Sequence, residues 1–597
     1  MKFRSFNKYM AVVLTVCSTL IFSCKKYLEV KPQSAFAPED VFSNVSSVNS
    51  AIMGVYQLLA GDDGYGQRQS LVFPNDTDEF TRSGDVDAGA RGLARYVADA
   101  GNSELPATFI RGYNGIERAN LCIKYIPAMN AYNNGTEADK KELRRMYAEA
   151  LTLRAIYYFD LVKNWGDVPL QTEPSVSGMD FNVSKVNSEV IYDRILGDLL
   201  IAERLLPWRK ETVSDERITQ GAARGLRARI ALFRGGYMLR RTSKVMERLP
   251  DYLKYYTMAR DECDTVMKSG QHSLNPSFYD VWKKVNELVL DNVYGERMLE
   301  VAMGGGNANF DSKLGRASGT RIADGSRYGP GGGAQNPTTS YFYAFDPADP
   351  RREVTISNYN IDVRNLKSPA RVTEMNDGKY RRDWRPIIAG ATQTLGMNWV
   401  MLRYADILLM YAEAVNEINS GPDAAAVRAF EDVRRRAFSA DLSKVGRTPL
   451  DKAGFFTAIV KERSLELGGE GIRKYDLVRW NLLGAKLQEA KTVMTSLINA
   501  AQYPKYLYYR NVGEEFEFYP GTGYYLPEPA VPPAPLYNAI TNPNGYIRVE
   551  WRQSLNTSSG GFIEKLGRSF QPNHSEVLPI HKTITDLNPN LKQDFGY

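Results

Sequence analysis

The chain has 597 residues, of which 43% are hydrophobic and 24% charged, and this globular composition excludes gross disorder. Its net charge of +6 includes Lys2, Arg4 and Lys8. Without these three residues the excess charge is too small and too dispersed to predict nucleic-acid binding.

The first predicted element is a signal peptide over residues 1–23. A basic segment is followed by a thirteen-residue, mainly apolar run from Met10 to Phe22, too short to cross a bilayer, which needs about 20 residues. The run ends at Ser23-Cys24, which resembles a bacterial lipobox, where the signal is cut before a cysteine that receives diacylglycerol. We therefore expect lipidation at Cys24, with each buried CH₂ of the acyl chains contributing about 0.8 kcal/mol. The alternative is a soluble secreted protein with an unmodified cysteine.

Helical periodicity dominates the segment that follows, residues 24–269. Apolar residues recur at helical spacing, and Gly166 and Pro169 end the longest helix. Cys122 and Cys263 lie in helical segments and are expected to be buried; the sequence leaves open whether they form a disulfide. The predicted helices cover 46–61, 107–129, 137–170, 190–207, 218–239 and 251–268.

Each predicted helix has its own apolar face, and short loops join successive helices into antiparallel pairs. Such pairs stack into an α-solenoid, in which each pair buries its face against the next. The sequence shows no clean 34-residue repeat, so a tetratricopeptide-like array is inferred from helix length and pairing alone. The expected fold class is mainly α, with long irregular loop insertions and a few short strands.

The second predicted region covers residues 270–597. Residues 270–397 and 502–576 are rich in Gly, Pro, Tyr and Asn and predict long loops, with strand-like runs such as "MLEVAM" between turn signals. Residues 398–500 predict scaffold helices. The helix expected over 398–419 has apolar residues nearly all round, so we expect its charged residues to be paired with arginines elsewhere.

No catalytic motif is present in the sequence. The histidines, His272, His574 and His581, are far apart and form no HExxH motif, so each is expected on the surface or in a loop. There is no GxSxG elbow, and the glycines at 304–306 lack the GK[ST] ending of a phosphate-binding loop. These absences exclude the commonest hydrolase and nucleotide-binding classes and predict no cofactor.

One carboxylate pair has a spacing that could serve catalysis. Glu462 and Glu466 lie one helical turn apart, and a glycoside hydrolase needs two carboxylates. Arg463, Arg473 and Arg479 lie in the same segment and are expected to lower the carboxylate pKa values, whereas a general acid needs a raised pKa. The pair is therefore interpreted as part of a structural ion network, and the chain is not expected to be an enzyme.

Several segments together resemble the SusD/RagB family of Bacteroidota outer-membrane lipoproteins. The opening "SCKKYLEVKPQ" resembles the lipidated start of that family, and "LRRMYAEALTLRAIYYFDLVKNWGDVPL" resembles its long helix. "WVMLRYADILLMYAEAVNE" and "IVKERSLELGGEGIRKYDLVRW" follow in the family order, and "VLPIHKTITDLNPNLKQDFGY" resembles its carboxyl-terminal close. In that close, His581 and Asp594-Phe595 depart from the usual Pro and Asn-Pro.

The resemblance implies a fold and a function. Members have tetratricopeptide-like helix pairs that support a variable binding half, and a lipid at the amino terminus holds them on the cell surface. They pair with a SusC-like TonB-dependent outer-membrane barrel, cap it as a hinged lid, and deliver glycans or, in some members, peptides without cleaving them. Contacts with a bound ligand would then stabilise the closed lid and shift the population toward it.

Site residues do not transfer from the family motifs, so they are predicted from location and chemistry. A sugar ring has apolar faces that suit aromatic planes and a hydroxyl rim that suits carboxylate, amide and guanidinium groups. The acidic group Asp76, Asp78 and Glu79 is an alternative calcium site, although its spacing fits no EF-hand. The predicted ligand-binding residues are Tyr65, Asp78, Arg82, Tyr328, Tyr341 and Trp384.

Three alternatives remain open at the level of the sequence. The same architecture could bind peptides, the chain could be a glycan-degrading surface enzyme, or a tetratricopeptide-type scaffold could bind other proteins on its concave face. The sequence does not distinguish a glycan from a peptide, nor a linear glycan from a branched one.

Overall fold

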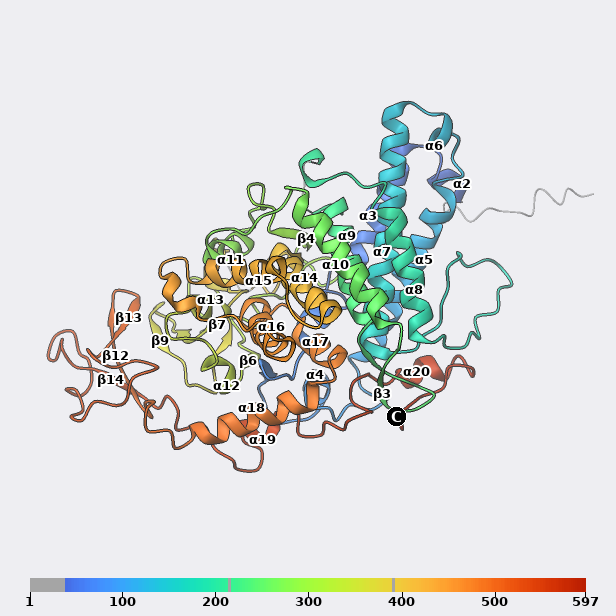
Figure 1. The fold of residues 1–597 in the computed structure, drawn as a ribbon. Helices are drawn as coiled ribbons and strands as arrows, with labels where there is room; N and C mark the ends of the chain where they lie inside the picture. Colours follow the sequence, from blue (N-terminus) through green and yellow to red (C-terminus); the bar gives the residue numbers. More distant parts are fainter. Residues whose placement is uncertain (1–37, 213–215, 389–391) are drawn as a thin grey trace, which may run out of the picture.

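The computed structural model describes residues 38–212, 216–388 and 392–597 (Figure 1). The predicted signal peptide and Cys24 therefore lie outside the described residues. The long helices agree with the predicted mainly α class. They are α3 (Val45–Tyr56), α5 (Leu105–Tyr125), α7 (Glu137–Trp165), α8 (Ser188–Ala202), α9 (Gln220–Arg234), α10 (Tyr252–Lys268), α14 (Tyr404–Asn419), α15 (Ala424–Ala437), α16 (Lys452–Leu467) and α18 (Leu483–Leu497).

Local signals set both ends of α7, the longest helix. At its start, the Thr136 side chain accepts a hydrogen bond from the backbone N–H of Asp139, and the Asp139 carboxylate accepts one from the N–H of Thr136. This reciprocal pairing satisfies two amides that the helix itself leaves unpaired. At its end, Gly166 has a φ of 70°, which glycine adopts without strain. Both ends agree with the sequence prediction.

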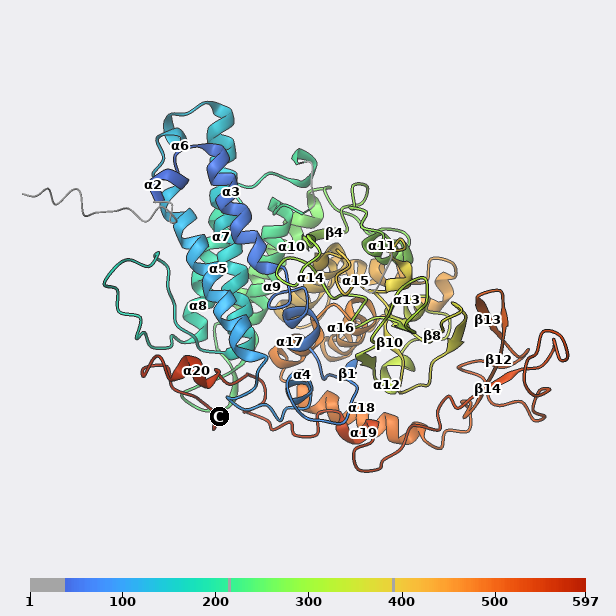
Figure 2. The ribbon, with the colours of Figure 1, turned by 180° about the vertical axis from the view of Figure 1, so that it is seen from behind.

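The long helices form one continuous stack. Helices α3 and α5 pack on α7, and the order then continues through α8, α9 and α10 (Figure 1). Helix α10 packs on α14, although about 130 residues separate them, and α14 packs on α15 and α16. The helical stack therefore continues directly from α10 to α14, across the loop-rich segment that separates them in sequence. Figure 2 shows the same stack from behind, with α3, α5 and α7 together at one end.

Short strands and short helices lie in the predicted loop-rich segments and also between the long helices. Strand β4 (Arg297–Val301) confirms the predicted "MLEVAM" strand, and β12 (Leu507–Val512) lies between β13 (Glu515–Phe518) and β14 (Ile547–Val549). The other strands are β1 (Phe80–Arg82), β2 (Tyr237–Leu239), β3 (Met246–Arg248), β5 (Arg321–Ile322), β6 (Gln335–Pro337), β7 (Ile356–Ser357), β8 (Tyr359–Ile361), β9 (Lys367–Pro369), β10 (Asn376–Asp377) and β11 (Trp399–Arg403). The short helices are α2 (Pro38–Val41), α4 (Ala90–Ala94), α6 (Asn130–Asn134), α11 (Phe278–Asn286), α12 (Thr339–Phe342), α13 (Arg351–Thr355), α17 (Arg473–Arg479), α19 (Phe562–Lys565) and α20 (Lys582–Thr585).

The helix predicted over 398–419 begins too early. Residues Trp399–Arg403 form strand β11, which pairs antiparallel with β4, and helix α14 begins only at Tyr404. All five residues of β11 are buried, so their backbone groups need partners, and β4 supplies them. The expectation that the helix is buried nearly all round is confirmed, because α14 is buried from Ala405 to Asn416.

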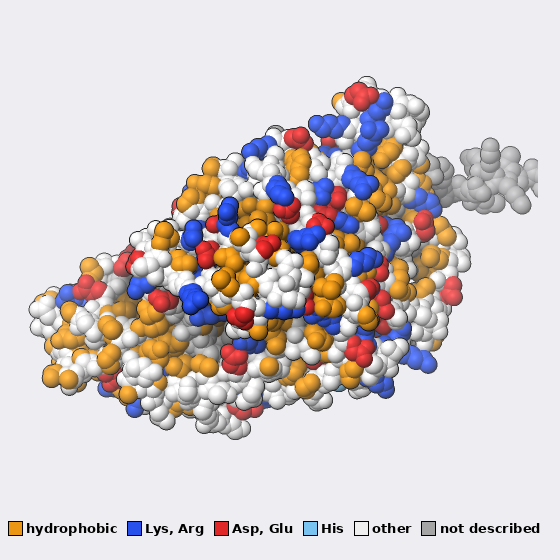
Figure 3. Space-filling model, in the orientation of Figure 1, with side chains coloured by type: hydrophobic (Ala, Val, Ile, Leu, Met, Phe, Trp, Pro, Cys, Tyr) orange, Lys and Arg blue, Asp and Glu red, His pale blue; other side chains and the backbone are white. Residues whose placement is uncertain are grey.

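Strands β12, β13 and β14 form a protruding lobe, and the chain then returns to end near α20 (Figure 1). Hydrophobic side chains gather over this end of the molecule in Figure 3. The segment between β13 and β14 contains the exposed Val531, Leu536 and Ile540. Elsewhere on that face, blue cations and red carboxylates are interspersed. No helix among the described residues is both long enough and apolar enough to span a bilayer.

The cysteines Cys122 and Cys263 are free and buried. Burial raises the pKa of the Cys122 thiol to about 12. Both thiols therefore behave as small apolar side chains of the helical core, which settles the disulfide question that the sequence left open.

Candidate ligand-binding site

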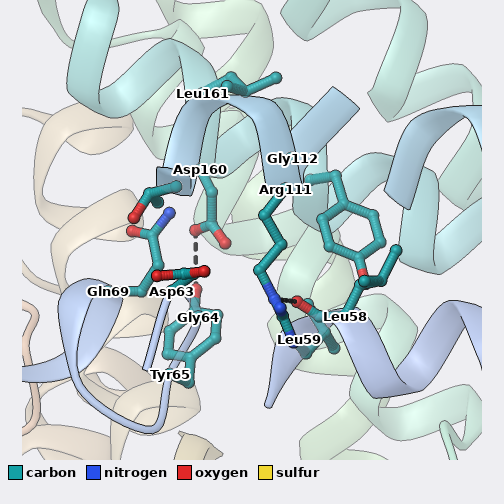
Figure 4. A pocket seen from close by; sticks show the side chains of 12 residues that line it. Leu58, Leu59, Asp63, Gly64, Tyr65, Gln69, Arg111, Gly112, Asp160 and Leu161 are labelled. Carbon is teal, nitrogen blue, oxygen red and sulfur yellow. Dashed lines mark hydrogen bonds between the residues drawn. The ribbon is translucent and has the colours of Figure 1, made fainter. Parts of the chain in front are cut away.

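The six predicted site residues do not converge on one place. Tyr65 lies between the end of α3 and α7, and its hydroxyl donates a hydrogen bond of 2.7 Å to the Asp160 carboxylate (Figure 4). Only 6% of Tyr65 is exposed. The pocket beside it, between Arg111 and Asp160, has a volume of about 20 Å³, which holds one water molecule and no sugar ring.

Asp78 and Tyr341 are brought together by the tertiary structure. Strand β1 pairs with β6, so the segment after the first long helix lies against the middle loops. The hydroxyl of Thr338, which caps α12, donates a hydrogen bond of 2.6 Å to the backbone carbonyl of Asp78 and accepts one from the N–H of Tyr341. The sequence predicted both residues as binding candidates, but it contained no sign that they are neighbours.

A cavity of about 430 Å³ opens beside these two residues, between α12, α16 and α18. This volume lies within the range of roughly 300–1,000 Å³ typical of small-molecule sites. The cavity combines an apolar floor with hydroxyl, ammonium, guanidinium and carboxylate groups, the mixture that a sugar ring requires. We call it the first cavity; its lining includes Asp78, Ser340, Tyr341, Tyr343, Ala344, Lys461, Ser464, Arg473, Lys486, Glu489 and Ala490.

Internal interactions hold the walls of the first cavity in place. Arg473 binds both carboxylate oxygens of Asp78, at 2.9 and 2.6 Å. The Tyr341 hydroxyl donates to the backbone carbonyl of Ser464 at 2.8 Å, which ties α12 to α16. Tyr343 is half-buried, its hydroxyl accepting from the indole N–H of Trp551 at 3.0 Å. The wall is therefore preformed, which lowers the entropic cost of ordering a ligand.

A second cavity of about 380 Å³ adjoins the first along the outer side of α16. Ala344, Thr457, Lys461 and Leu465 line both cavities. The second cavity extends toward α15 and the loop that follows it. Together the two cavities form a groove along α16, which we call the α16 groove.

The other predicted residues lie outside the α16 groove. Arg82 donates a hydrogen bond of 2.7 Å to the carbonyl of Leu71. Tyr328 lies beneath Arg327, whose guanidinium carbon is 4.8 Å from the centre of its ring. Trp384 stacks edge-on against the exposed Tyr279, with ring centres 5.0 Å apart. Tyr328 and Trp384 are half-buried, and neither lines a cavity described above.

Sequence reasoning missed most of the groove. Ser340, Tyr343, Lys461 and Lys486 were not predicted, although one signal was present. Residues 457, 461, 464 and 465 form a helical stripe on α16, opposite the buried carboxylate of Glu466. The periodicity could identify this stripe, but it could not show that α12 and α18 flank it.

The carboxylates Glu462 and Glu466 belong to a buried ion network, as predicted, but their partners differ from those expected. Arg351 binds Glu462 at 2.5 Å and Glu466 at 3.1 Å. Arg403 contacts Glu466 at 2.8 Å, and Arg436 also bonds to it. Arg463 projects from α16 in a direction different from those of Glu462 and Glu466, and Arg473 and Arg479 belong to the next helix, α17. Their own acceptors are Asp406 and Asp476 for Arg463, Asp78 for Arg473, and Glu413 for Arg479.

This network makes Glu466 a poor acid. Burial by itself raises the pKa of Glu466, but the three guanidinium groups around it outweigh burial and lower that pKa to about 2. The opposite case is Glu79, where burial raises the pKa to about 8 against the lowering effect of Arg473. Glu79 is only 2% exposed and is not part of the cavity lining, so it has no contact with a ligand in the groove.

The acidic group near β1 is engaged internally. Asp76 accepts a hydrogen bond of 2.6 Å from the Thr81 hydroxyl and another from the N–H of Gly567, while Asp78 pairs with Arg473. Within the part of the chain that the structure describes, no group of three or more His, Cys, Asp or Glu side chains is placed to hold a metal ion. His272 and His581, expected on the surface or in loops, lie in loops and are buried.

Comparison with known proteins gives a consistent family. Residues 336–597 match the family described as "SusD family", and residues 26–232 match the one described as "Starch-binding associating with outer membrane". The chain is 26% identical over 501 residues to a SusD-like protein, P25, of Formosa agariphila, covering 77% of this chain and 88% of the relative.

Solved structures agree with this result. A SusD homolog from Bacteroides thetaiotaomicron superimposes with a TM-score of 0.77 at 23% identity, covering 94% of this chain and 98% of that one. A laminarin-binding SusD-like protein superimposes with a TM-score of 0.63 at 22% identity, covering 93% of this chain and all of the other. The two family matches together span more than half of the sequence, and the chain belongs to the SusD family.

Proposed function

We propose that this protein is a cell-surface lipoprotein that binds a glycan and delivers it, uncleaved, to a partner TonB-dependent outer-membrane transporter. The observation that carries glycan binding is the α16 groove, whose two cavities of about 430 and 380 Å³ lie end to end along one helix. A groove of this kind suits an extended chain of sugar rings better than a single small molecule. The laminarin-binding relative supports the same ligand class.

Binding without cleavage is supported by the state of the carboxylates. Hydrolysis of a glycosidic bond requires one carboxyl group with a raised pKa at the bond that breaks. In the groove wall, Glu462 and Asp349 are both held by Arg351, and Asp78 is held by Arg473. These three carboxylates are thus already engaged by arginines of the protein, so none of them is free to approach the glycosidic oxygen of a bound glycan.

The binding proposal is tested by closing the groove. Ala344 lines both cavities, so Ala344→Trp places an indole where the ligand would lie. We expect glycan retention in affinity electrophoresis to fall at least tenfold, with an unchanged melting temperature. Ala138→Trp, at an exposed position in the first turn of α7, is the matched control and should bind as the wild type does.

Three outcomes would contradict the proposal. The first is that no polysaccharide from a panel of neutral and anionic polymers is retained, while immobilised peptides are; the ligand would then be a peptide. The second is that the purified protein releases new reducing ends from any polymer, which would make it an enzyme. The third is equal retention by the two tryptophan variants, which would place the site elsewhere.

Anchoring and partnership need separate measurements. Mass spectrometry of the native protein should find diacylglycerol on Cys24, and Cys24→Ala should move the protein from the membrane fraction into the medium. Affinity purification of the tagged wild type from native outer membranes should recover a large TonB-dependent barrel. Recovery of a periplasmic complex in its place would favour the assembly-scaffold alternative.

A further inference from the structure

The second cavity of the α16 groove has a distinctive set of charged residues. Its lining contains Arg434 from α15, Lys444 and Arg447 from the following loop, and Lys461 from α16. Arg434 lies 4.0 Å from Glu462 and donates a hydrogen bond of 3.3 Å to the Thr448 hydroxyl. Lys444, Arg447 and Lys461 are exposed, and no carboxylate in the described ranges lies within ion-pair distance of any of the three.

The carboxylates in the same lining do not neutralise these cations. Asp349 and Glu462 are both engaged by the fully buried Arg351, at 2.8 and 2.5 Å. The remaining acidic residue, Asp346, is exposed and forms no ion pair within the described residues, so its single charge offsets at most one of the three unpaired cations. The mouth of the cavity therefore carries an excess of positive charge beyond the balanced network at its floor.

The first cavity differs in this respect. Its Lys486 pairs with Glu489 at 2.7 Å, and its Arg473 pairs with Asp78 at 2.6 Å. Lys461, the one unpaired cation in that lining, stands at the wall that the two cavities share. Along α16, the first cavity therefore contains mainly paired charges, whereas the second cavity contains several unpaired cations.

We infer that the ligand is an anionic glycan, and that the second cavity holds its carboxylate or sulfate group while the first cavity holds sugar rings. This inference rests on the proposed glycan-binding function and adds the charge of the substrate to it. Ammonium and guanidinium groups form charge-assisted hydrogen bonds with carboxylate and sulfate oxygens, and these are stronger than bonds to a neutral hydroxyl. A neutral glycan would offer the three cations only the weaker bonds to hydroxyl groups.

The decisive variant removes the charge and keeps the shape. The triple variant Lys444→Gln, Arg447→Gln, Lys461→Gln should lose at least tenfold of the wild-type affinity for anionic polysaccharides in isothermal titration. A second triple variant with the same net charge, Lys141→Gln, Lys582→Gln, Lys592→Gln, changes exposed lysines outside the groove lining. It should bind within twofold of the wild type.

The probes separate the two anionic groups from each other and from neutral polymers. Polygalacturonate supplies carboxylates, carrageenan supplies sulfates, and laminarin supplies neither. At least one of the two anionic polymers should bind the wild type more tightly than laminarin does. Raising NaCl from 0.05 to 0.5 M should weaken that binding, because salt screens exposed charges.

The failures are distinguishable. Retention of laminarin alone, by both the wild type and the triple variant, leaves the proposed function standing and overturns the anionic inference. Retention of no polysaccharide at all removes both. Equal binding of an anionic polymer by the two triple variants shows that the charge of the second cavity does not contribute, and this also overturns the inference.

Discussion

The charged residues on the two sides of helix α16 have different roles. On the inner side, Glu466 is buried and contacted by three guanidinium groups. On the outer side, Lys461 faces the groove without a carboxylate partner among the described residues. What a charged residue contributes to the free energy of unfolding thus depends more on its burial and its partners than on the residue type.

This difference separates structure from function within a single helix. Buried charges that are fully paired hold α16 against β11 and α15, and their loss exposes their partners to an apolar interior. Exposed charges without partners contribute little to folding but remain available to a ligand. Substitutions on the two sides should therefore affect different measurements.

The largest expected effect comes from the inner side. Arg403 contacts Glu296, Glu466 and Glu470 at 2.7–2.9 Å and is fully buried. Arg403→Met leaves these carboxylates with fewer partners, and we expect the free energy of unfolding in urea to fall by about 3–5 kcal/mol. Lys461→Met, on the outer side, should change it by no more than about 0.5 kcal/mol. Equal losses would remove the distinction between the two sides.

Lowering the pH should reduce the free energy of unfolding by nearly as much. Because the pKa of Glu466 is lowered to about 2, its contribution is present above the unfolded pKa and is lost as the pH falls from about 4.5 toward 2. At about 1.4 kcal/mol per pKa unit, the contribution is about 3 kcal/mol. Unfolding measured against pH should show this slope in the wild type. In Glu466→Gln the slope over that range should be shallower; identical slopes would assign the acid sensitivity to other groups.

A smaller effect is expected at Tyr65, the predicted binding residue that the structure buries. Tyr65→Phe removes the hydrogen bond to Asp160, and we expect a loss of about 1.5–3 kcal/mol in unfolding free energy. Glycan retention should not change, because the neighbouring pocket holds only one water molecule. A tenfold loss of retention with unchanged stability would reverse this assignment.

The smallest effect is expected at Trp384. Its ring packs against Tyr279 away from the groove lining, so Trp384→Ala should reduce glycan retention less than twofold. A loss of tenfold or more, at unchanged melting temperature, would place the sugar-binding surface at Tyr279 and Trp384. That result would leave the α16 groove as a secondary contact at most.

The helices and their ends could be predicted because their signals are local. Thr136 and Gly166 mark the limits of α7 within a few residues of themselves, and apolar periodicity identifies which face of each helix is buried. The loop-rich character of the middle segment was equally visible, since turn residues punctuate it. Strand β11 was missed because its identity depends on β4, about 100 residues earlier.

The amino-acid sequence by itself determined the helical solenoid, the lowered pKa of Glu466 on α16 and the family to which the chain belongs. Only the tertiary structure decided which arginines reach those carboxylates, that Asp78 and Tyr341 meet, and that α12, α16 and α18 enclose a groove. The reason is physical: secondary structure follows from neighbours along the chain, whereas a cavity exists only where elements distant in sequence leave space between them.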